Sequence, residues 1–322
     1  MGKKVLEVKD LVTTFRIGKK EYEVLRGVSF DIEENETLCM VGESGCGKSV
    51  TTLSIMDLLP NNGRVVSGSI KLNGQELTTL SPKERNALRG KQMGMIFQEP
   101  MTALNPLLTI GRQMTEGLRL HLGMSREEAY ETAVSYLEKV GIANPGDRMK
   151  QYPFQLSGGL RQRVMIAMVM AAQPSLLIAD EPTTALDVTI QAKILELIRS
   201  IQKERGISVI YITHDLGVVA KVADYVDVMY AGKIVETGTI DEIFYEPRHP
   251  YTWGLLSAMP DLDTADDRLY TIPGSPPNLL HEKPGDAFAP RNHYALNIDD
   301  EVDPPMFKTS DTHYAATWLL DP

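Results

Sequence analysis

The feature that most constrains the fold of this chain is a glycine-rich segment, "GESGCGKS", at residues 42–49. It fits G-x-x-x-x-G-K-[ST], the pattern of a loop that holds phosphate groups. The apolar run "TLCMVG" leads into it, and "KSVTTLSIMDLL" follows with the composition of a helix that stops at Pro60. A phosphate cradle requires this position between a strand and a helix. The sequence therefore predicts an α/β fold with a nucleotide-binding core.

The chemistry of such a loop assigns expected roles to its residues. Glycines let the chain curl so that successive N–H groups meet the phosphates of a nucleotide. Lys48 adds a point charge to the β- and γ-phosphate oxygens, and Ser49 offers a hydroxyl group to Mg²⁺. The predicted nucleotide-binding residues of this segment are Gly42, Glu43, Ser44, Gly45, Cys46, Gly47, Lys48, Ser49 and Val50.

Two further apolar runs end in polar side chains, "SLLIADEP" and "ISVIYITHD". Parallel strands carry their ligands beyond their carboxyl ends. Asp180 is therefore expected to hold Mg²⁺, directly or through water, and Glu181 to polarise the attacking water. His214 ends the neighbouring strand, where its imidazole is expected to reach the γ-phosphate side. No pair of His or Cys has the spacing of a zinc site.

The rest of the chain predicts three other parts. Alternating apolar and polar residues, with an Asn73-Gly74 turn, indicate an antiparallel sheet. A helical subdomain is expected over about 105–172, including a helix capped by Ser125 that ends at Gly141. Beyond residue 240 the sequence is rich in proline. It is expected to be irregular but ordered, because a disordered tail rarely contains so many aromatic residues: Phe288, Phe307, Tyr314 and Trp318.

Composition argues against several classes of function, although less strongly than the motifs argue for one. The formal charge of −10 argues mildly against nucleic-acid binding, although net charge hides local patches. The only cysteines, Cys39 and Cys46, are too few for a disulfide framework or a four-thiolate metal site. The N-terminus lacks the pattern of a signal peptide, which predicts a cytoplasmic chain. The longest apolar run, "VMIAMVMAA", is about half the length needed to cross a bilayer. Any membrane function would thus require docking on other subunits.

Six elements in a fixed order resemble the ATP-binding cassette (ABC) ATPases. They are "GESGCGKS", Gln98 in "IFQEP", "LSGGLRQR", "LLIADEP", "ALD" at 185–187, and His214. The resemblance covers residues 4–240, so an ABC ATPase domain is expected over 1–240 and an extension over 241–322. It implies that Gln98 contacts Mg²⁺ or water and senses a transmembrane partner. It also implies that Asp187 lines a subunit interface and that His214 orients the γ-phosphate.

The same resemblance implies an aromatic residue that stacks on adenine near the end of the first strand. Phe15 is the best placed, and Tyr22 is the second candidate.

The resemblance also explains why the chain has a second glycine-rich segment. In ABC ATPases the Leu-Ser-Gly-Gly loop closes over ATP bound to the P-loop of a second subunit. Ser157, Gly158 and Gly159 are therefore expected to face the partner's ATP from a helix N-terminus. Leu160 replaces the more familiar glutamine of this motif, and little loss is expected because the N–H groups and Ser157 are intact.

Two C-terminal strings narrow the family. "EPRHPYTWGLLSAMP" and "IPGSPPNLL…GDAFAPR" resemble the extension of ATPase subunits from oligopeptide and dipeptide importers. Many of these hold an iron–sulfur cluster on cysteines after "FAPR". No iron–sulfur cluster is expected here, since no cysteine follows Cys46.

The resemblance implies the cofactors ATP and Mg²⁺ and an assembly at the cytoplasmic face of the cell membrane. The expected partners are a second, distinct ATPase subunit, two integral membrane permease subunits and an extracytoplasmic substrate-binding protein, with no nucleic acid.

Other functions remain open at this level. Related importers carry nickel, glutathione or oligosaccharides instead of peptides. A soluble ABC protein acting on DNA or ribosomes usually has two cassettes, coiled coils or zinc insertions, none of which is visible. A P-loop kinase would leave the loop at Ser157 unexplained. Five histidines are interpreted as structural: His121, His249, His281, His293 and His313.

Overall fold

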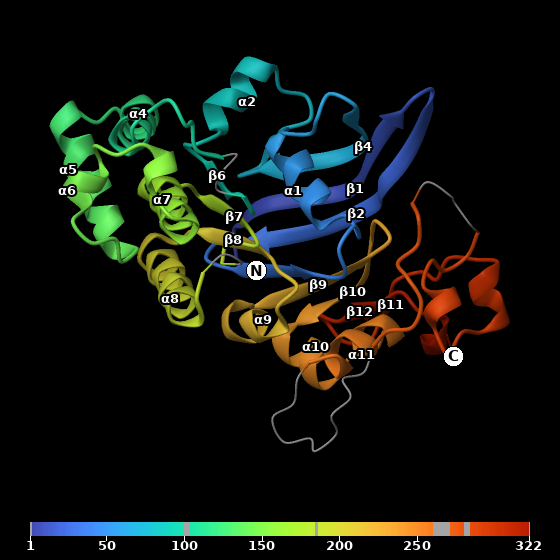
Figure 1. The fold of residues 1–322 in the computed structure, drawn as a ribbon. Coiled ribbons are helices and arrows are strands. Elements are labelled where there is room, and N and C mark those ends of the chain that lie inside the picture. Colours follow the sequence, from blue (N-terminus) through green and yellow to red (C-terminus); the bar gives the residue numbers. More distant parts are fainter. Residues whose placement is uncertain (1, 100–102, 184–185, 260–270, 280–283, 322) are drawn as a thin grey trace. The chain divides into compact units, whose positions relative to one another are not determined.

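The computed structural model describes residues 2–99, 103–183, 186–259, 271–279 and 284–321 (Figure 1). The interpretations of Ala185 and His281 lie outside the described residues. The chain divides into two compact units. We call residues 1–5, 33–36 and 79–211 the helical unit, and residues 6–32, 37–78 and 212–322 the P-loop unit.

The P-loop unit contains the predicted antiparallel sheet, with strand order β2-β1-β4-β5. Its strands are β1 (Lys4–Ile17), β2 (Lys20–Glu33), β4 (Gly63–Leu72) and β5 (Gln75–Glu76). Apolar residues on alternate positions are buried, and Leu6 lies opposite Leu72. Asn73 and Gly74, at φ values of 49° and 80°, form the two-residue turn between β4 and β5. The left-handed backbone at both positions suits Asn-Gly, so the predicted hairpin is confirmed.

A second sheet of the P-loop unit runs in the order β11-β12-β10-β9-β3. Its strands are β3 (Thr37–Val41), β9 (Tyr225–Tyr230), β10 (Lys233–Thr239), β11 (Phe307–Lys308) and β12 (Tyr314–Ala315). The helices of this unit are α1 (Lys48–Met56), α9 (Leu216–Val222), α10 (Ile240–Tyr245) and α11 (Pro250–Ser257). Strand β3 is parallel to β9, and all its residues are buried, as its apolar sequence predicts.

The described residues of the helical unit form the strands β6 (Met93–Ile96), β7 (Leu176–Asp180) and β8 (Ser208–Ile212). They are neighbours in the order β8-β7-β6, every residue in them is buried, and β6 pairs with β7 in parallel. Its described residues also form the helices α2 (Pro82–Leu88), α4 (Ile110–Leu122), α5 (Arg126–Lys139), α6 (Pro145–Arg148), α7 (Gly158–Ala171) and α8 (Val188–Arg205).

The predicted helical region packs around α5, which contacts both α4 and α7 (Figure 1). Ser125 caps α5 and forms a capping box with Glu128, so the predicted helix start is confirmed. The apolar run at 164–172 lies mostly within α7, where Val164, Ile166 and Met170 are fully buried. Among the described residues, no helix is both long enough and apolar enough to span a bilayer.

The aromatic residues of the C-terminal extension form ordered contacts. The ring of Phe288 is buried, 5.2 Å from that of Tyr230 and 5.3 Å from that of Tyr251. Phe307 and Trp318 pack edge to face at 5.9 Å. These contacts explain why a proline-rich segment with few regular elements is ordered: its aromatic side chains bury large apolar areas.

Candidate functional site

The backbone of the P-loop requires glycine at two positions. Gly42 and Gly47 have φ values of 148° and 115°. A Cβ atom at residue 42 would collide with the carbonyl oxygen of Met229, and one at residue 47 would lie 2.9 Å from the Leu25 side chain. The loop can follow this path only because both residues lack side chains.

Helix α1 begins directly after this loop, at Lys48. Its N-cap residue, Gly47, makes no side-chain capping hydrogen bond, and no acidic residue lies in the first turn. The first N–H groups of a helix have no partner within the helix, and the helix dipole favours negative charge at this end. The α1 N-terminus and the loop before it therefore form a cradle that fits a phosphate group.

Lys48 brings a positive charge into this cradle. Its ammonium donates to the carbonyl oxygens of Gly42 at 2.7 Å and Glu43 at 3.0 Å, and the residue is 8% exposed. Burial raises the pKa of the neighbouring Cys46 thiol, which favours the uncharged form. Ser49, the next residue, is half-buried. The glycine cradle, the uncapped helix end and the lysine together fit the triphosphate that the sequence predicts.

Glu43 is held by residues of the C-terminal extension. Its N–H donates to the Tyr251 hydroxyl at 2.8 Å, and its carboxylate forms a bidentate ion pair with Arg291. Sequence reasoning missed both partners. Tyr251 and Arg291 both belong to the two C-terminal segments that carry the family resemblance. Nothing in the sequence of those segments indicates a contact with the P-loop.

In the helical unit, strand β7 delivers two carboxylates to its end. Asp180 is 6% exposed. Glu181 has a φ of 46°, a left-handed conformation that costs about 1–2 kcal/mol in a residue with a side chain. The Gln98 amide donates to the Glu181 carboxylate at 2.9 Å. The structure thus brings together two predicted catalytic residues, and the backbone strain is typical of a functional site.

The Leu-Ser-Gly-Gly segment forms the start of α7. Ser157 is its N-cap residue, and the Ser157 hydroxyl accepts a weak hydrogen bond of 3.4 Å from the Leu160 N–H. Both Ser157 and Gly158 are exposed, and no atom lies within 4 Å of where a Cβ atom of residue 158 would be. The first turn of α7 contains no acidic residue. An open helix N-terminus is thereby presented at the surface of the helical unit.

Two contacts connect this helix and the next one to the segment after Glu181. Gln162 of α7 is fully buried, and its amide donates to the Pro182 carbonyl at 2.5 Å. Asp187 caps α8 by accepting from the Ile190 N–H at 3.0 Å. Asp187 therefore has a structural role whether or not it also lines a subunit interface.

Three other residues predicted to contact a nucleotide lie in strands or shortly after one. Phe15 is half-buried near the end of β1 and packs over Gly63, whose Cβ atom would lie 2.9 Å from the ring. Tyr22 is half-buried in β2. His214 follows β8 and is exposed. Their roles toward a nucleotide stay predictions.

Two histidines interpreted as structural are buried. The His249 ring nitrogen Nδ1 accepts from the Tyr251 N–H and so caps α11, and burial lowers the pKa of His249 to about 4. His313 lies 2.7 Å from the buried carboxylate of Glu236.

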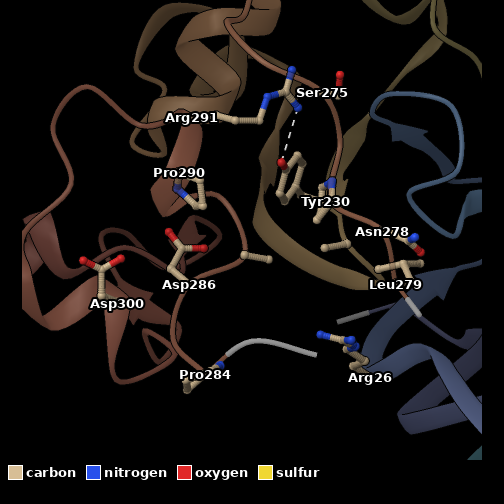
Figure 2. Close-up of a pocket in the computed structure, with 13 residues that line it drawn as sticks. Arg26, Tyr230, Ser275, Asn278, Leu279, Pro284, Asp286, Pro290, Arg291 and Asp300 are labelled. Carbon is tan, nitrogen blue, oxygen red and sulfur yellow. Dashed lines mark hydrogen bonds between the residues drawn. The ribbon is translucent and has the colours of Figure 1, made fainter. Parts of the chain in front are cut away.

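The P-loop unit also contains a cavity of 470 Å³, bordered by Tyr230, Asp286 and Arg291 and by Arg26 on its other side (Figure 2). Burial raises the pKa of Asp286 to about 6. The residues that line the cavity do not include any of the P-loop, so it is separate from the phosphate cradle.

Comparison with known proteins identifies the class of molecule that these features define. Residues 25–184 match the family model "ABC transporter", and residues 235–298 match "Oligopeptide/dipeptide transporter, C-terminal region". The dimeric cassette MJ0796, bound to ADP and Pi in a post-hydrolysis state, has a similar fold, with a TM-score of 0.67 and 28% identity over 73% of this chain and 98% of its own.

Full-length relatives place the chain more closely. It is 57% identical to the oligopeptide transport ATP-binding protein OppD of Bacillus subtilis, covering 99% of this chain and 90% of that protein. It is 52% identical to the dipeptide transport ATP-binding protein DppD of Lactococcus lactis, covering 99% and 92%. The chain belongs to the ABC transporter family, among the oligopeptide and dipeptide transport ATP-binding proteins. It is an ATPase subunit that couples ATP hydrolysis to transport.

Proposed function

We propose that this chain powers the import of oligopeptides or dipeptides through separate membrane subunits. The observation that carries this proposal is the pair of matches along one chain, an ATPase segment followed by a C-terminal region typical of peptide transporters. The relatives described above are peptide transport proteins by name, so peptides are the cargo class best supported.

In this proposal the P-loop, residues 42–49, binds the phosphates of ATP, with Phe15 against the adenine. Lys48 leaves its contacts with loop carbonyls to pair with phosphate oxygens. Mg²⁺, when bound, neutralises phosphate charge, and Ser49, Asp180 and Gln98 are the residues that would hold it or its waters. Among the described residues no three His, Cys, Asp or Glu side chains form a metal cluster, but magnesium on a nucleotide needs only one or two protein ligands.

Glu181 is proposed as the base that orients and deprotonates the attacking water. The Gln98 amide donates to its carboxylate and fixes the direction of one oxygen. A general base must lie within hydrogen-bond reach of the water whose proton it takes, so a fixed carboxylate orientation favours this role. His214 is proposed to orient the γ-phosphate.

The exposed loop at Ser157–Gly159 is proposed to complete the ATP site of a second, distinct cassette. This pairing explains an open helix N-terminus without an acidic residue, since such an end favours an anion. The further proposed partners are two integral membrane permeases and an extracytoplasmic peptide-binding protein. The proposed location is peripheral, at the cytoplasmic face of the membrane.

Reconstitution of the chain with its cognate permeases and second cassette in proteoliposomes tests the proposal. Peptide-loaded binding protein should stimulate ATP hydrolysis and drive peptide uptake, and Lys48→Ala in this chain should reduce both. ATP-dependent uptake of another solute, with no response to peptides, would refute the peptide assignment. Failure to co-purify with integral membrane proteins would refute a role in transport.

A further inference from the structure

All polar groups of Glu43 are engaged by the P-loop unit itself. The backbone N–H donates to the Tyr251 hydroxyl, and the carbonyl accepts from Lys48. The carboxylate accepts two hydrogen bonds from Arg291, of 2.5 and 3.0 Å. Two of these three contacts come from the C-terminal extension. The second residue of the phosphate cradle is thus held from outside the ATPase segment.

Arg291 is itself fixed in place. Its side chain is 5% exposed, and its Nε donates to the Pro273 carbonyl at 2.7 Å. The guanidinium also donates to the Tyr230 hydroxyl at 3.3 Å (Figure 2). A planar guanidinium with several fixed partners loses little further freedom when it binds a carboxylate in bidentate geometry. The ion pair between Arg291 and Glu43 is therefore held in a fixed geometry, unlike a pair of mobile side chains at the surface.

Tyr251 is anchored in the same way. Its ring is fully buried, 4.6 Å from that of Tyr230 and 5.3 Å from that of Phe288. The hydroxyl is the only polar group of a side chain otherwise enclosed by aromatic rings, and it meets the Glu43 N–H. This N–H is consequently directed into the extension.

The charge of Glu43 is the reason that this arrangement matters for function. A carboxylate inside a phosphate-binding loop repels a polyanion, because like charges within a Debye length raise each other's free energy. The Arg291 ion pair balances that charge. We propose that Arg291 and Tyr251 are positioning residues of the nucleotide site, and that Arg291 neutralises Glu43 so that the P-loop accepts a triphosphate.

The inference rests on the proposed function of residues 42–49 in binding ATP. It predicts opposite signs for two substitutions that break the same ion pair. Arg291→Met leaves the Glu43 carboxylate unbalanced and should weaken ATP binding by about three- to tenfold. Glu43→Gln leaves the Arg291 guanidinium unbalanced and should strengthen ATP binding, because a positive charge beside the loop attracts the triphosphate. The double variant restores neutrality and should bind ATP within about twofold of the wild type.

The experiment measures the dissociation constant of ATP for the full chain at low and at high salt, together with the melting temperature of each variant. The effect of Arg291→Met should shrink at high salt, since screening weakens charge repulsion. It should also be larger for ATP than for ADP, which carries less charge. If Arg291→Met folds poorly, Arg291→Lys takes its place. This variant keeps the positive charge beside Glu43 and should bind ATP nearly as tightly as the wild type, and a large loss of ATP affinity in it would show that charge balance does not explain the role of Arg291.

Lys233→Met is the matched control, because Lys233 forms a 2.6 Å ion pair with Asp303 that connects β10 to the extension and includes no P-loop residue. This variant should leave ATP affinity unchanged. If Glu43→Gln and Arg291→Met weaken ATP binding equally, without salt dependence, the ion pair is only structural and the proposal is overturned. If wild type and Lys48→Ala bind ATP equally, the proposed function of the P-loop fails instead.

Discussion

Replacing Glu181 by glutamine tests the proposed base directly. The structure places Glu181 at the end of β7, in a left-handed conformation, with its carboxylate bound by Gln98 at 2.9 Å. Glutamine has almost the same size and keeps one oxygen that accepts this hydrogen bond. It cannot take a proton from water. The substitution therefore removes basicity while it preserves the local geometry.

The size of the expected loss in hydrolysis rate distinguishes removal of the base from removal of a residue that orients it. Loss of a general base lowers the rate by about 100- to 10,000-fold, or about 3–5 kcal/mol of barrier. Gln98→Ala removes one exposed hydrogen bond to the Glu181 carboxylate, worth about 1.5 kcal/mol or about tenfold in rate, together with one of the three proposed contacts to Mg²⁺ or its waters, but it leaves the base itself in place. Glu181→Gln should thus be at least ten times more damaging to hydrolysis than Gln98→Ala.

The assay measures phosphate release by the assembled complex and ATP binding by the separate chain. Both variants should bind ATP as the wild type does, and Glu181→Gln should hold the closed cassette pair. Glu99→Gln neutralises the carboxylate beside Gln98 in the chain and should change turnover by less than about twofold. An active Glu181→Gln complex, or equal losses for Glu181→Gln and Gln98→Ala, would refute the assignment of Glu181 as the base.

Three other perturbations test separate parts of the structure. Ser157→Trp should spare ATP binding by the single chain, because the side chain is exposed, yet suppress turnover of the complex; lost binding in the isolated variant would place this loop in its own chain's site. Burial raises the pKa of Asp286 to about 6, so its contribution to stability is present below pH 4 and lost as pH rises through 6. Asp286→Asn should therefore raise the free energy of unfolding by about 1–2 kcal/mol at pH 7.5 but not at pH 4, measured by urea denaturation; a pH-independent gain would contradict this. Gly42→Ala should lower the free energy of unfolding by more than about 2 kcal/mol and abolish ATP binding, because the new Cβ atom collides with the Met229 carbonyl oxygen. Gly45→Ala should lower it by only about 1–2 kcal/mol, because residue 45 has a φ of 82° but open space around it. Equal losses of stability in the two variants would show that the loop backbone adapts.

Much of the fold could be predicted because its signals are local. The Asn73-Gly74 turn, the Ser125 cap and the buried strand β3 each follow from a few neighbouring residues. The P-loop was predicted for the same reason, since glycine spacing within eight residues determines its path. The left-handed conformation of Glu181 had no such signal, because glutamate rarely adopts it and tertiary contacts must impose it.

The contact between Glu43 and Arg291 shows where sequence reasoning ends. The two residues are 248 positions apart, and either would pair equally well with many other charged residues of the chain. Only the packed fold selects the pair. The domain division at residue 240 stays a prediction, although the P-loop and residues 241–322 lie in the same compact unit.

The charge distribution explains how an acidic chain can bind a polyanion. The formal net charge of −10 would repel ATP if all charges acted together. At physiological salt, however, charges farther away than about 8 Å are largely screened. Within the cradle the structure offers the Lys48 ammonium and an α1 N-terminus without an acidic first turn, and it balances Glu43 with Arg291. The local field is therefore favourable to phosphate while the chain as a whole is negative. We therefore expect nucleotide affinity to depend on the ion pair between Glu43 and Arg291 more than on the other acidic residues of the chain combined.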